Sequence, residues 1–256
     1  MGGTGRRVAA LLLGAALGAA GCTSGGDGGR PGPTGAPPAT RSAAYGKPCL
    51  QAGERAAAFR FRVGQGFDTV GVVLGQGRRG LVFGHQRGGD LCEWVPTARS
   101  YARLGYRALV FDFHDQDRLD QDVVAAVAEL RRRGVDRVVL VGSSMGATAV
   151  LVAATRVRPP VAGVVSLSGP AVFGDLDARP AVGRLRVPAL FMAARRDGPF
   201  PAAARGLYRA AATPDKRLLV LSSAAHGTNL LSFGGEAAAA RAAVRRFVAA
   251  HLGGSG

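Results

Sequence analysis

The stretch that decides the fold is VVLVGSSMGATAV, residues 138–150. It begins as an apolar, β-branched run of strand length and continues, after a glycine-rich turn, as an alanine-rich segment typical of a helix. The turn, Gly142–Gly146, has the form G-x-S-x-G, which places its central residue, Ser144, on a bend with an exposed hydroxyl at the start of a helix. A glycine-rich turn with a chance serine is the alternative, so the rest of the chain must supply an acid and a base.

Composition limits the classes of function. The chain has 256 residues, of which 47% are hydrophobic, enough for the core of one substantial domain or two small ones. Its net charge of +16 is spread along the sequence and comes almost entirely from arginine. Because no basic stripe alternates with aromatic residues, nucleic acid is a poor candidate partner. Attraction to an anionic envelope surface fits this charge better.

The first 44 residues have the pattern of an export signal and a tether. Residues 1–21 place a basic pair before a short apolar run, which is too short to span a bilayer comfortably. Residues 19–22 resemble a bacterial lipobox, which implies that Cys22 becomes the lipid-modified first residue of a protein held outside the cytoplasm on the cell membrane; a plain secretory signal is the alternative. Residues 22–44 are rich in Gly, Pro, Ser and Thr, which predicts a disordered linker.

The predicted domain, residues 45–256, alternates strands with helices from residue 81 onward. This alternation predicts an α/β fold with a mostly parallel, eight-stranded sheet and helices on both faces. Residues 75–80 match G-x-G-x-x-G, but a strand follows them, so a hairpin turn is predicted instead of a dinucleotide site. The strands are expected at 59–63, 69–74, 80–84, 107–113, 137–141, 161–167, 189–194 and 218–221, and the helices at 93–104, 117–133, from 145 onward, 201–212 and 237–252.

An acid should follow the serine in the sequence if Ser144 is a nucleophile. Asp197 lies just beyond the strand predicted at 189–194, on the edge where the sites of parallel sheets assemble. Asp175 and Asp177 are rival acids, but they lie further from the end of their preceding strand. Asp197 is therefore the predicted acid, with a simple turn residue before Gly198 as the alternative.

A base should follow the acid, and His226 occupies that place. It lies in a loop of small residues after the last predicted strand, on the same sheet edge as Ser144, where it can take the serine proton. The other histidines fit less well. His85 precedes the serine, His114 lies in an acidic loop, 114–117, which fits a solvated loop better than a cation site, and His251 lies near the C-terminus.

An oxyanion site needs two backbone N–H groups directed at the oxygen of the tetrahedral intermediate. Met145, directly after the serine at a helix N-terminus, is predicted to supply one of them. The second should come from the loop after the third strand, residues 84–94.

Residues 58–252, with their Gly142–Gly146 turn, resemble the α/β-hydrolase family. The resemblance implies an open site under a minimal lid, because only residues 169–187 fill the interval in which the family usually carries its lid. The family's usual His-Gly after the third strand is replaced here by His85-Gln86. The second oxyanion donor is therefore either Gln86 or Arg87, and Gln86 is predicted.

Two cysteines remain once Cys22 is set aside. Outside the cytoplasm, Cys49 and Cys92 favour a disulfide over two buried thiols. No cluster has the spacing of metal ligands, and no cofactor is expected. The sequence thus predicts a lipid-anchored serine hydrolase. The predicted activity is that of a carboxylesterase acting on a small ester or acyl substrate. A peptidase or acyltransferase with the same residues, or a non-catalytic envelope-binding lipoprotein, is the alternative.

Overall fold

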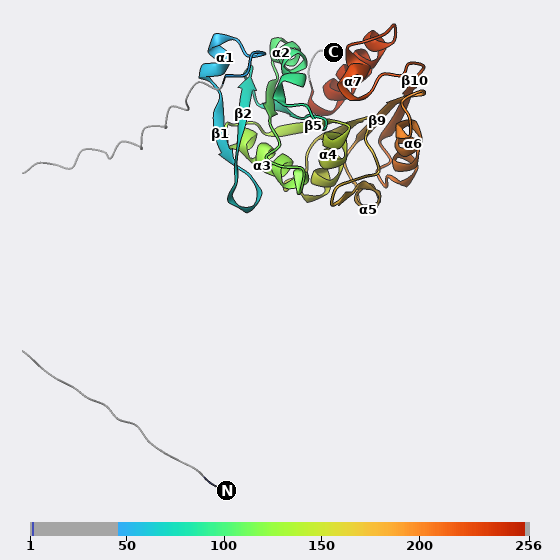
Figure 1. Cartoon of the computed structure of the whole chain (residues 1–256), viewed down its shortest axis with the longest axis horizontal. Coiled ribbons are helices and arrows are strands. Elements are labelled where there is room, and N and C mark those ends of the chain that lie inside the picture. The colour runs from blue at the N-terminus through green and yellow to red at the C-terminus, as the bar shows by residue number, and fades with distance from the viewer. Residues whose placement is uncertain (1, 3–45, 254–256) are drawn as a thin grey trace, which may run out of the picture. The chain divides into compact units, whose positions relative to one another are not determined.

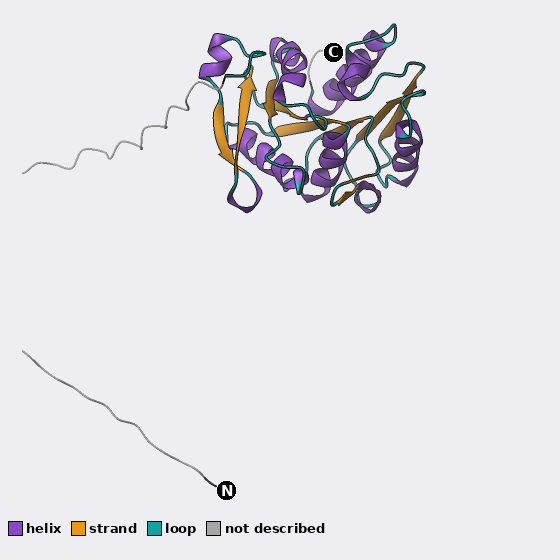
Figure 2. Ribbon diagram, viewed as in Figure 1, coloured by secondary structure: helices purple, strands orange, loops and turns teal. Residues whose placement is uncertain are grey.

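The computed structural model describes residue 2 and residues 46–253, and its main element is an eight-stranded sheet (Figures 1 and 2). Apart from residue 2, the predicted signal peptide lies outside the described residues, as do the predicted linker and Cys22, the predicted site of lipidation. The strand order is β1-β2-β4-β3-β5-β6-β9-β10. The strands are β1 (Phe59–Arg62), β2 (Asp68–Leu74), β3 (Arg79–Gly84), β4 (Arg107–Phe111), β5 (Arg137–Ser143), β6 (Gly163–Leu167), β9 (Ala189–Ala194) and β10 (Lys216–Leu221).

The sheet is mostly parallel, as predicted. Only β2 runs against its neighbours, pairing antiparallel with both β1 and β4, whereas all pairs from β4 to β10 are parallel. The hairpin predicted at residues 75–80 is wrong, because β2 and β3 are not paired and β4 lies between them. The turn instead sends the chain across β4 to the next position in the sheet.

Helices cover both faces, because residues along each central strand alternate between the two faces. Val82 belongs to the core beneath α3 (Leu119–Arg132), α4 (Met145–Arg156) and α6 (Phe200–Ala210). Its neighbours Leu81 and Phe83 belong to the core beneath α2 (Val95–Arg103) and α7 (Ala237–Leu252). In Figure 1, α2 and α7 lie above the strands, and α3 and α4 lie below them. Within the described residues, no helix has both the length and the apolar character that crossing a bilayer requires.

Two predicted helices begin later than expected, each for a local reason. The segment before α2 is a 3₁₀ turn, η2 (Leu91–Glu93), in which the Cys92 N–H donates a 2.8 Å hydrogen bond to the carboxylate of the capping residue Asp90. Helix α3 begins after Arg118, whose φ of 55° is left-handed and cannot continue a right-handed helix.

The segment between β6 and β9 is short, as predicted. It holds a two-stranded hairpin, β7 (Val172–Phe173) with β8 (Leu176–Asp177), and one small helix, α5 (Ala178–Val182). The remaining short helical elements of the described chain are α1 (Ala52–Ala56), η1 (Gly64–Gly66) and η3 (Gly227–Leu231).

Candidate active site

The turn between β5 and α4 forces a serine into an unusual backbone conformation. Ser144 has φ 50° and ψ −115°, a backbone conformation that residues other than glycine rarely adopt. A Cβ on Gly142 would lie 2.2 Å from the carbonyl oxygen of Gly146, and a Cβ on Gly146 would lie 2.4 Å from that of Gly84. Both glycines are therefore required by direct contact between backbones, and the turn has the strained geometry that its sequence predicts.

This turn presents Ser144 outward. Ser144 is half-buried, whereas the flanking residues of β5 and α4 are buried. Its amide is held by a 2.8 Å hydrogen bond to the carbonyl of Leu167 on β6. Met145 is the first residue of α4, where backbone N–H groups have no partner within the helix. The turn thus offers a hydroxyl beside a backbone donor.

A histidine and a carboxylate pair at the same edge of the sheet. His226 Nδ1 lies 2.9 Å from Asp197 Oδ2 and 3.0 Å from Oδ1. Asp197 is only 8% exposed, and the ring of Phe200 packs 4.3 Å from the imidazole ring. Since the carboxylate accepts a hydrogen from Nδ1, the opposite nitrogen, Nε2, is left able to accept a proton.

The loop of His226 lies against the serine turn. Ser144, Asp197 and His226 follow the parallel strands β5, β9 and β10, so all three lie at one sheet edge. A Cβ on Gly227 would lie 3.4 Å from the Cβ of Ser143. Within the described chain, no hydrogen bond joins Ser144 to His226, and such bonds often tighten only with substrate present.

The rival acids lie in other surroundings. Asp175 is exposed and accepts a 3.3 Å hydrogen bond from the amide of Arg118. Asp177 caps α5 and pairs with Arg179 on the surface. The carboxylate that the structure places on His226 is therefore Asp197.

A second serine, which no sequence motif indicates, supports the His–Asp pair. Ser168 is fully buried directly after β6, with φ 50°. Its hydroxyl donates to Asp197 Oδ2 over 2.7 Å and accepts the N–H of Gly227 over 3.1 Å. It thereby joins the carboxylate to the backbone beside His226. The sequence signal that could have pointed to Ser168 is its position as a polar residue directly after an apolar strand, at the sheet edge that carries the site.

His85 fixes the loop that follows β3. Its Nε2 accepts the amide hydrogen of Phe113 over 3.0 Å, and its Nδ1 lies 2.8 Å from the carbonyl oxygen of Gln86. Burial lowers the pKa of His85, which favours the neutral ring that this pattern of one acceptor and one donor nitrogen requires. His85 therefore acts as a structural tie between two loops and has no free nitrogen to act as a base.

The amide predicted as second oxyanion donor is already occupied. The Gln86 N–H donates to Glu93 Oε2 over 2.8 Å, so it cannot point at a substrate oxygen in this arrangement. The prediction of Gln86 is not supported by this geometry. Of the two residues left open by the sequence, Arg87 is the one whose backbone N–H makes no hydrogen bond within the described residues.

Glu93 was expected only as the start of a helix, yet it joins the two loops of the site. Besides Gln86, its carboxylate accepts a 3.4 Å hydrogen bond from the hydroxyl of Thr228, two residues after His226. Burial raises the pKa of Glu93, opposed by these hydrogen bonds and by the nearby His226. The position of Glu93 in the loop after β3 could have suggested a role in the site. The sequence did not show that role, because Thr228, which it holds, lies far away along the chain.

His114 forms a second pair with a carboxylate, outside this site. Its Nδ1 lies 2.7 Å from Oδ2 of the fully buried Asp122, and Phe67 stacks on its ring. The rest of the 114–117 loop is exposed, as predicted for a solvated loop. Burial also raises the pKa of Asp122. Within the described residues, no group of three or more His, Cys, Asp or Glu side chains is arranged to hold a metal ion.

Cys49 and Cys92 form the predicted disulfide, with their Cα atoms 5.6 Å apart. The bond joins the start of the domain to η2, the turn that carries Glu93. Beside it, Lys47 forms ion pairs with Asp90 and with Asp112. The N-terminal segment is thus fastened to the loop of the candidate site by a covalent bond and by charge.

A mostly parallel eight-stranded sheet with a serine at the tight turn after β5 and a His–Asp pair at its edge defines an α/β hydrolase. The sequence model of the dienelactone hydrolase family matches residues 106–250, a range that includes Ser144, Asp197 and His226. The chain belongs to the dienelactone hydrolase family and is a hydrolase. The search of curated protein sequences found no match.

Several solved structures share the fold. An esterase from Pyrococcus furiosus aligns with a TM-score of 0.66 at 15% identity, covering 77% of this chain and 91% of its own. A dienelactone hydrolase from Anabaena variabilis aligns with a TM-score of 0.61 at 25% identity, covering 76% and 96%. The esterase domain of a Rhodothermus marinus protein aligns with a TM-score of 0.63 at 22% identity, covering 77% of this chain and 99% of its own.

Proposed function

We propose that this protein is an extracytoplasmic, lipid-anchored serine hydrolase that cleaves a carboxylic ester through an acyl-enzyme. The observation that carries the proposal is the 2.9 Å contact between His226 and Asp197 at the sheet edge where Ser144 stands on its strained turn. Nucleophile, base and acid are the three parts that activate a hydroxyl for attack at neutral pH.

In the proposed first step, Ser144 Oγ forms a bond to the ester carbonyl carbon while its proton passes to His226 Nε2. Asp197 holds the Nδ1–H and stabilises the imidazolium that forms. When the tetrahedral intermediate collapses, the ester C–O bond breaks and the alcohol leaves with the proton from His226. Water then attacks the acyl group on Ser144 with the same base, which yields the carboxylic acid and the free serine.

The proposed oxyanion donors are the backbone N–H groups of Met145 and Arg87. Met145 has the geometry of a helix N-terminus, with its amide free of a helical partner. Arg87 lies in the turn closed by the 3.1 Å hydrogen bond from the Gly89 N–H to the Gln86 carbonyl. With Glu93 holding the preceding amide, this turn is fixed beside the serine, and each such donor typically contributes about 10²–10³-fold in rate.

The proposal of location rests on Cys22 and the linker after it, supported by the Cys49–Cys92 disulfide, since such bonds persist outside the cytoplasm. Its test is the mature N-terminus. An acylated Cys22 is expected, with processing blocked by globomycin. An unmodified N-terminus at any other residue would contradict the anchor and leave the enzymatic proposal in place.

A panel of p-nitrophenyl esters of rising chain length tests the reaction. Asp197→Asn should lose most of the hydrolytic activity, because the carboxylate no longer fixes the imidazole. Asp175→Asn is the matched control and should keep it, because Asp175 is exposed and bonded to Arg118. Loss in the control alone would overturn the choice of acid.

A peptidase or acyltransferase with the same three residues is distinguished by its acyl acceptor. Such an enzyme would cleave peptides, or transfer the acyl group to an added alcohol or amine, faster than it hydrolyses the esters. A non-catalytic binding protein would hydrolyse none of these substrates.

A further inference from the structure

We propose that the outward face of α7 binds the anionic surface of a phospholipid bilayer. Four exposed arginines define this face, which we call the α7 surface: Arg217 on β10, and Arg241, Arg245 and Arg246 on α7. This interaction is separate from the proposed chemistry and does not require a lipid at Cys22.

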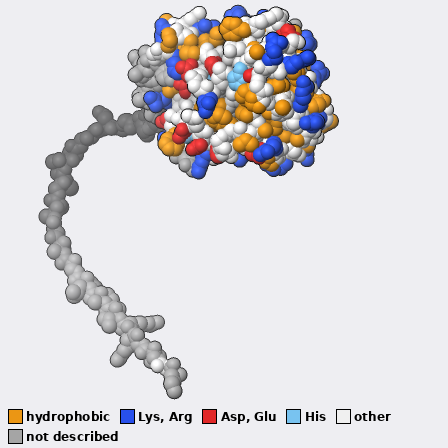
Figure 3. Space-filling view, turned by 45° about the vertical axis from the view of Figure 1, so that its right-hand side comes forward, with side chains coloured by type: hydrophobic (Ala, Val, Ile, Leu, Met, Phe, Trp, Pro, Cys, Tyr) orange, Lys and Arg blue, Asp and Glu red, His pale blue; other side chains and the backbone are white. Residues whose placement is uncertain are grey.

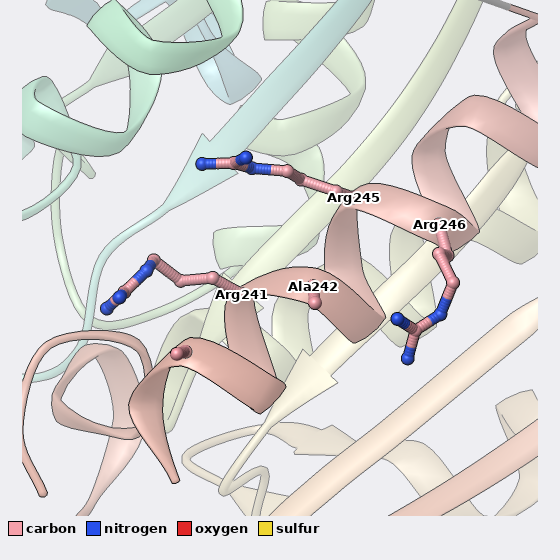
Figure 4. Close-up of a pocket in the computed structure, with 5 residues that line it drawn as sticks. Arg241, Ala242, Arg245 and Arg246 are labelled. Carbon is pink, nitrogen blue, oxygen red and sulfur yellow. The ribbon is translucent and has the colours of Figure 1, made fainter. Parts of the chain in front are cut away.

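The α7 surface is hollowed and carries positive charge. An open groove of about 400 Å³ is lined by Arg241, Arg245 and Arg246, with Ala238 and Ala242 between them. Arg241 and Arg245 extend to one side of the helix and Arg246 to the other (Figure 4). Because the intervening residues are alanines, they do not reach as far as the guanidinium groups that flank them.

A neighbouring groove of about 260 Å³ continues the surface toward the sheet edge. Arg217 and Arg246 contribute to it, and the rest of its lining is apolar, including Leu218 and Leu219 on β10 and Ala243 on α7. The whole surface thus combines guanidinium groups with apolar side chains.

No acidic residue contributes to either groove, and within the described residues none of the four arginines forms an ion pair with a carboxylate. Other arginines of the domain do have such partners, for example Arg156 with Asp120 and Arg99 with Glu54. In Figure 3, Lys and Arg side chains gather toward the upper right of the face shown. An unneutralised group of guanidinium ions attracts phosphate, which it can bind with two parallel hydrogen bonds.

The chemistry of the surface favours a bilayer over nucleic acid. Among the residues that line the two grooves, the one aromatic residue is Phe247, which is only 5% exposed and so offers no open ring face for stacking on bases. Alanine and leucine side chains between arginines suit the boundary between headgroups and acyl chains.

The test uses the chain from Thr23 onward, which lacks the predicted acylation site, in co-sedimentation with vesicles. Vesicles of phosphatidylglycerol and phosphatidylcholine in equal parts should bind it, and pure phosphatidylcholine vesicles should not. Added salt should weaken the binding. Failure of the wild type to bind the anionic vesicles would overturn the proposal.

The informative variant is Arg217→Gln/Arg245→Gln/Arg246→Gln. Arg241 is kept, because its Nη1 donates to the carbonyl of Leu231 at the end of η3, the helical turn that follows His226. Each arginine near an anionic surface contributes about a fivefold change in affinity, so the triple variant should bind about 100-fold more weakly. Its ester hydrolysis should be unchanged.

The matched control, Arg60→Gln/Arg103→Gln/Arg184→Gln, removes the same charge from exposed positions elsewhere. It should keep most of the binding. Equal losses in both variants would show that net charge alone drives the attraction, and would overturn the α7 surface as a site. Tighter binding of the wild type to duplex DNA, lost in the first variant only, would reassign the surface to nucleic acid.

Discussion

The backbone amide of Gln86 donates a hydrogen bond to the carboxylate of Glu93 across 2.8 Å, and this contact decides which amide is free beside the serine. The same carboxylate accepts a hydrogen bond from Thr228, next to the loop of His226. Glu93 therefore holds together the loop of the proposed oxyanion site and the loop of the proposed base.

Glu93→Gln and Glu93→Ala separate the hydrogen bonds of this side chain from its charge. Glutamine keeps an acceptor for the Gln86 amide, so kcat near neutral pH should stay within a few-fold of wild type. Alanine leaves that amide unpaired, at a cost of about 1–3 kcal/mol, so kcat should fall about tenfold or more. A Glu93→Ala variant whose kcat equals that of Glu93→Gln would contradict the role of this carboxylate in fixing the loop.

The stability of the Glu93→Gln variant has a pH dependence of known sign. Burial raises the pKa of Glu93 above its ordinary value of 4.5, so the folded state binds this proton more tightly than the unfolded state does. The contribution to stability is therefore full below the ordinary value and is lost as pH rises through the raised pKa. Urea unfolding should show the variant gaining stability relative to wild type as pH rises from the ordinary value of 4.5 through the raised pKa of Glu93. A constant difference over that range would contradict this sign.

Ser168→Ala should impair catalysis without removing any group proposed to touch substrate. It deletes the 2.7 Å hydrogen bond to Asp197 and leaves the Gly227 amide without its acceptor. The loss of about 1.4 kcal/mol expected for such a bond corresponds to about a tenfold lower kcat, with KM little changed. Ser166→Ala, at a buried position within β6 two residues earlier, is the control. A kcat for Ser168→Ala equal to that of this control would rule out the positioning role.

Replacement of both Cys49 and Cys92 by serine should destabilise the domain. The disulfide closes a loop with a sequence separation of 43, for which the chain-entropy model gives about 4 kcal/mol. Urea unfolding of the variant measures the loss. Wild type treated with a thiol reductant should reach the same stability, and the variant should not respond to the reductant.

Much of the fold could be predicted from the sequence because its signals are local. Apolar strand-length runs alternate with amphipathic segments, and the turn at Gly142–Gly146 requires glycine at both ends through direct backbone contact. The order of the strands in the sheet was harder to predict from the sequence. Whether β3 follows β2 as a hairpin or crosses β4 depends on pairings between distant residues, so the predicted hairpin failed.

The site residues likewise fall into those that local sequence patterns predicted and those that they did not. Asp197 and His226 were recognisable because each follows a predicted strand at the edge where the serine lies. Ser168 and Glu93 were missed because their roles arise from hydrogen bonds to partners far away in the sequence, 29 residues for Ser168 and Asp197 and 135 for Glu93 and Thr228. The choice between Gln86 and Arg87 likewise depends on a carboxylate contact that no local pattern encodes.

The most direct test of the central claim is labelling by a fluorophosphonate, which reacts covalently with an activated serine. The wild-type protein should be labelled, and Ser144→Ala should not. Ser143→Ala is the matched control, because Ser143 is fully buried one residue earlier, and it should still be labelled. Labelling that persists in Ser144→Ala would contradict Ser144 as the nucleophile.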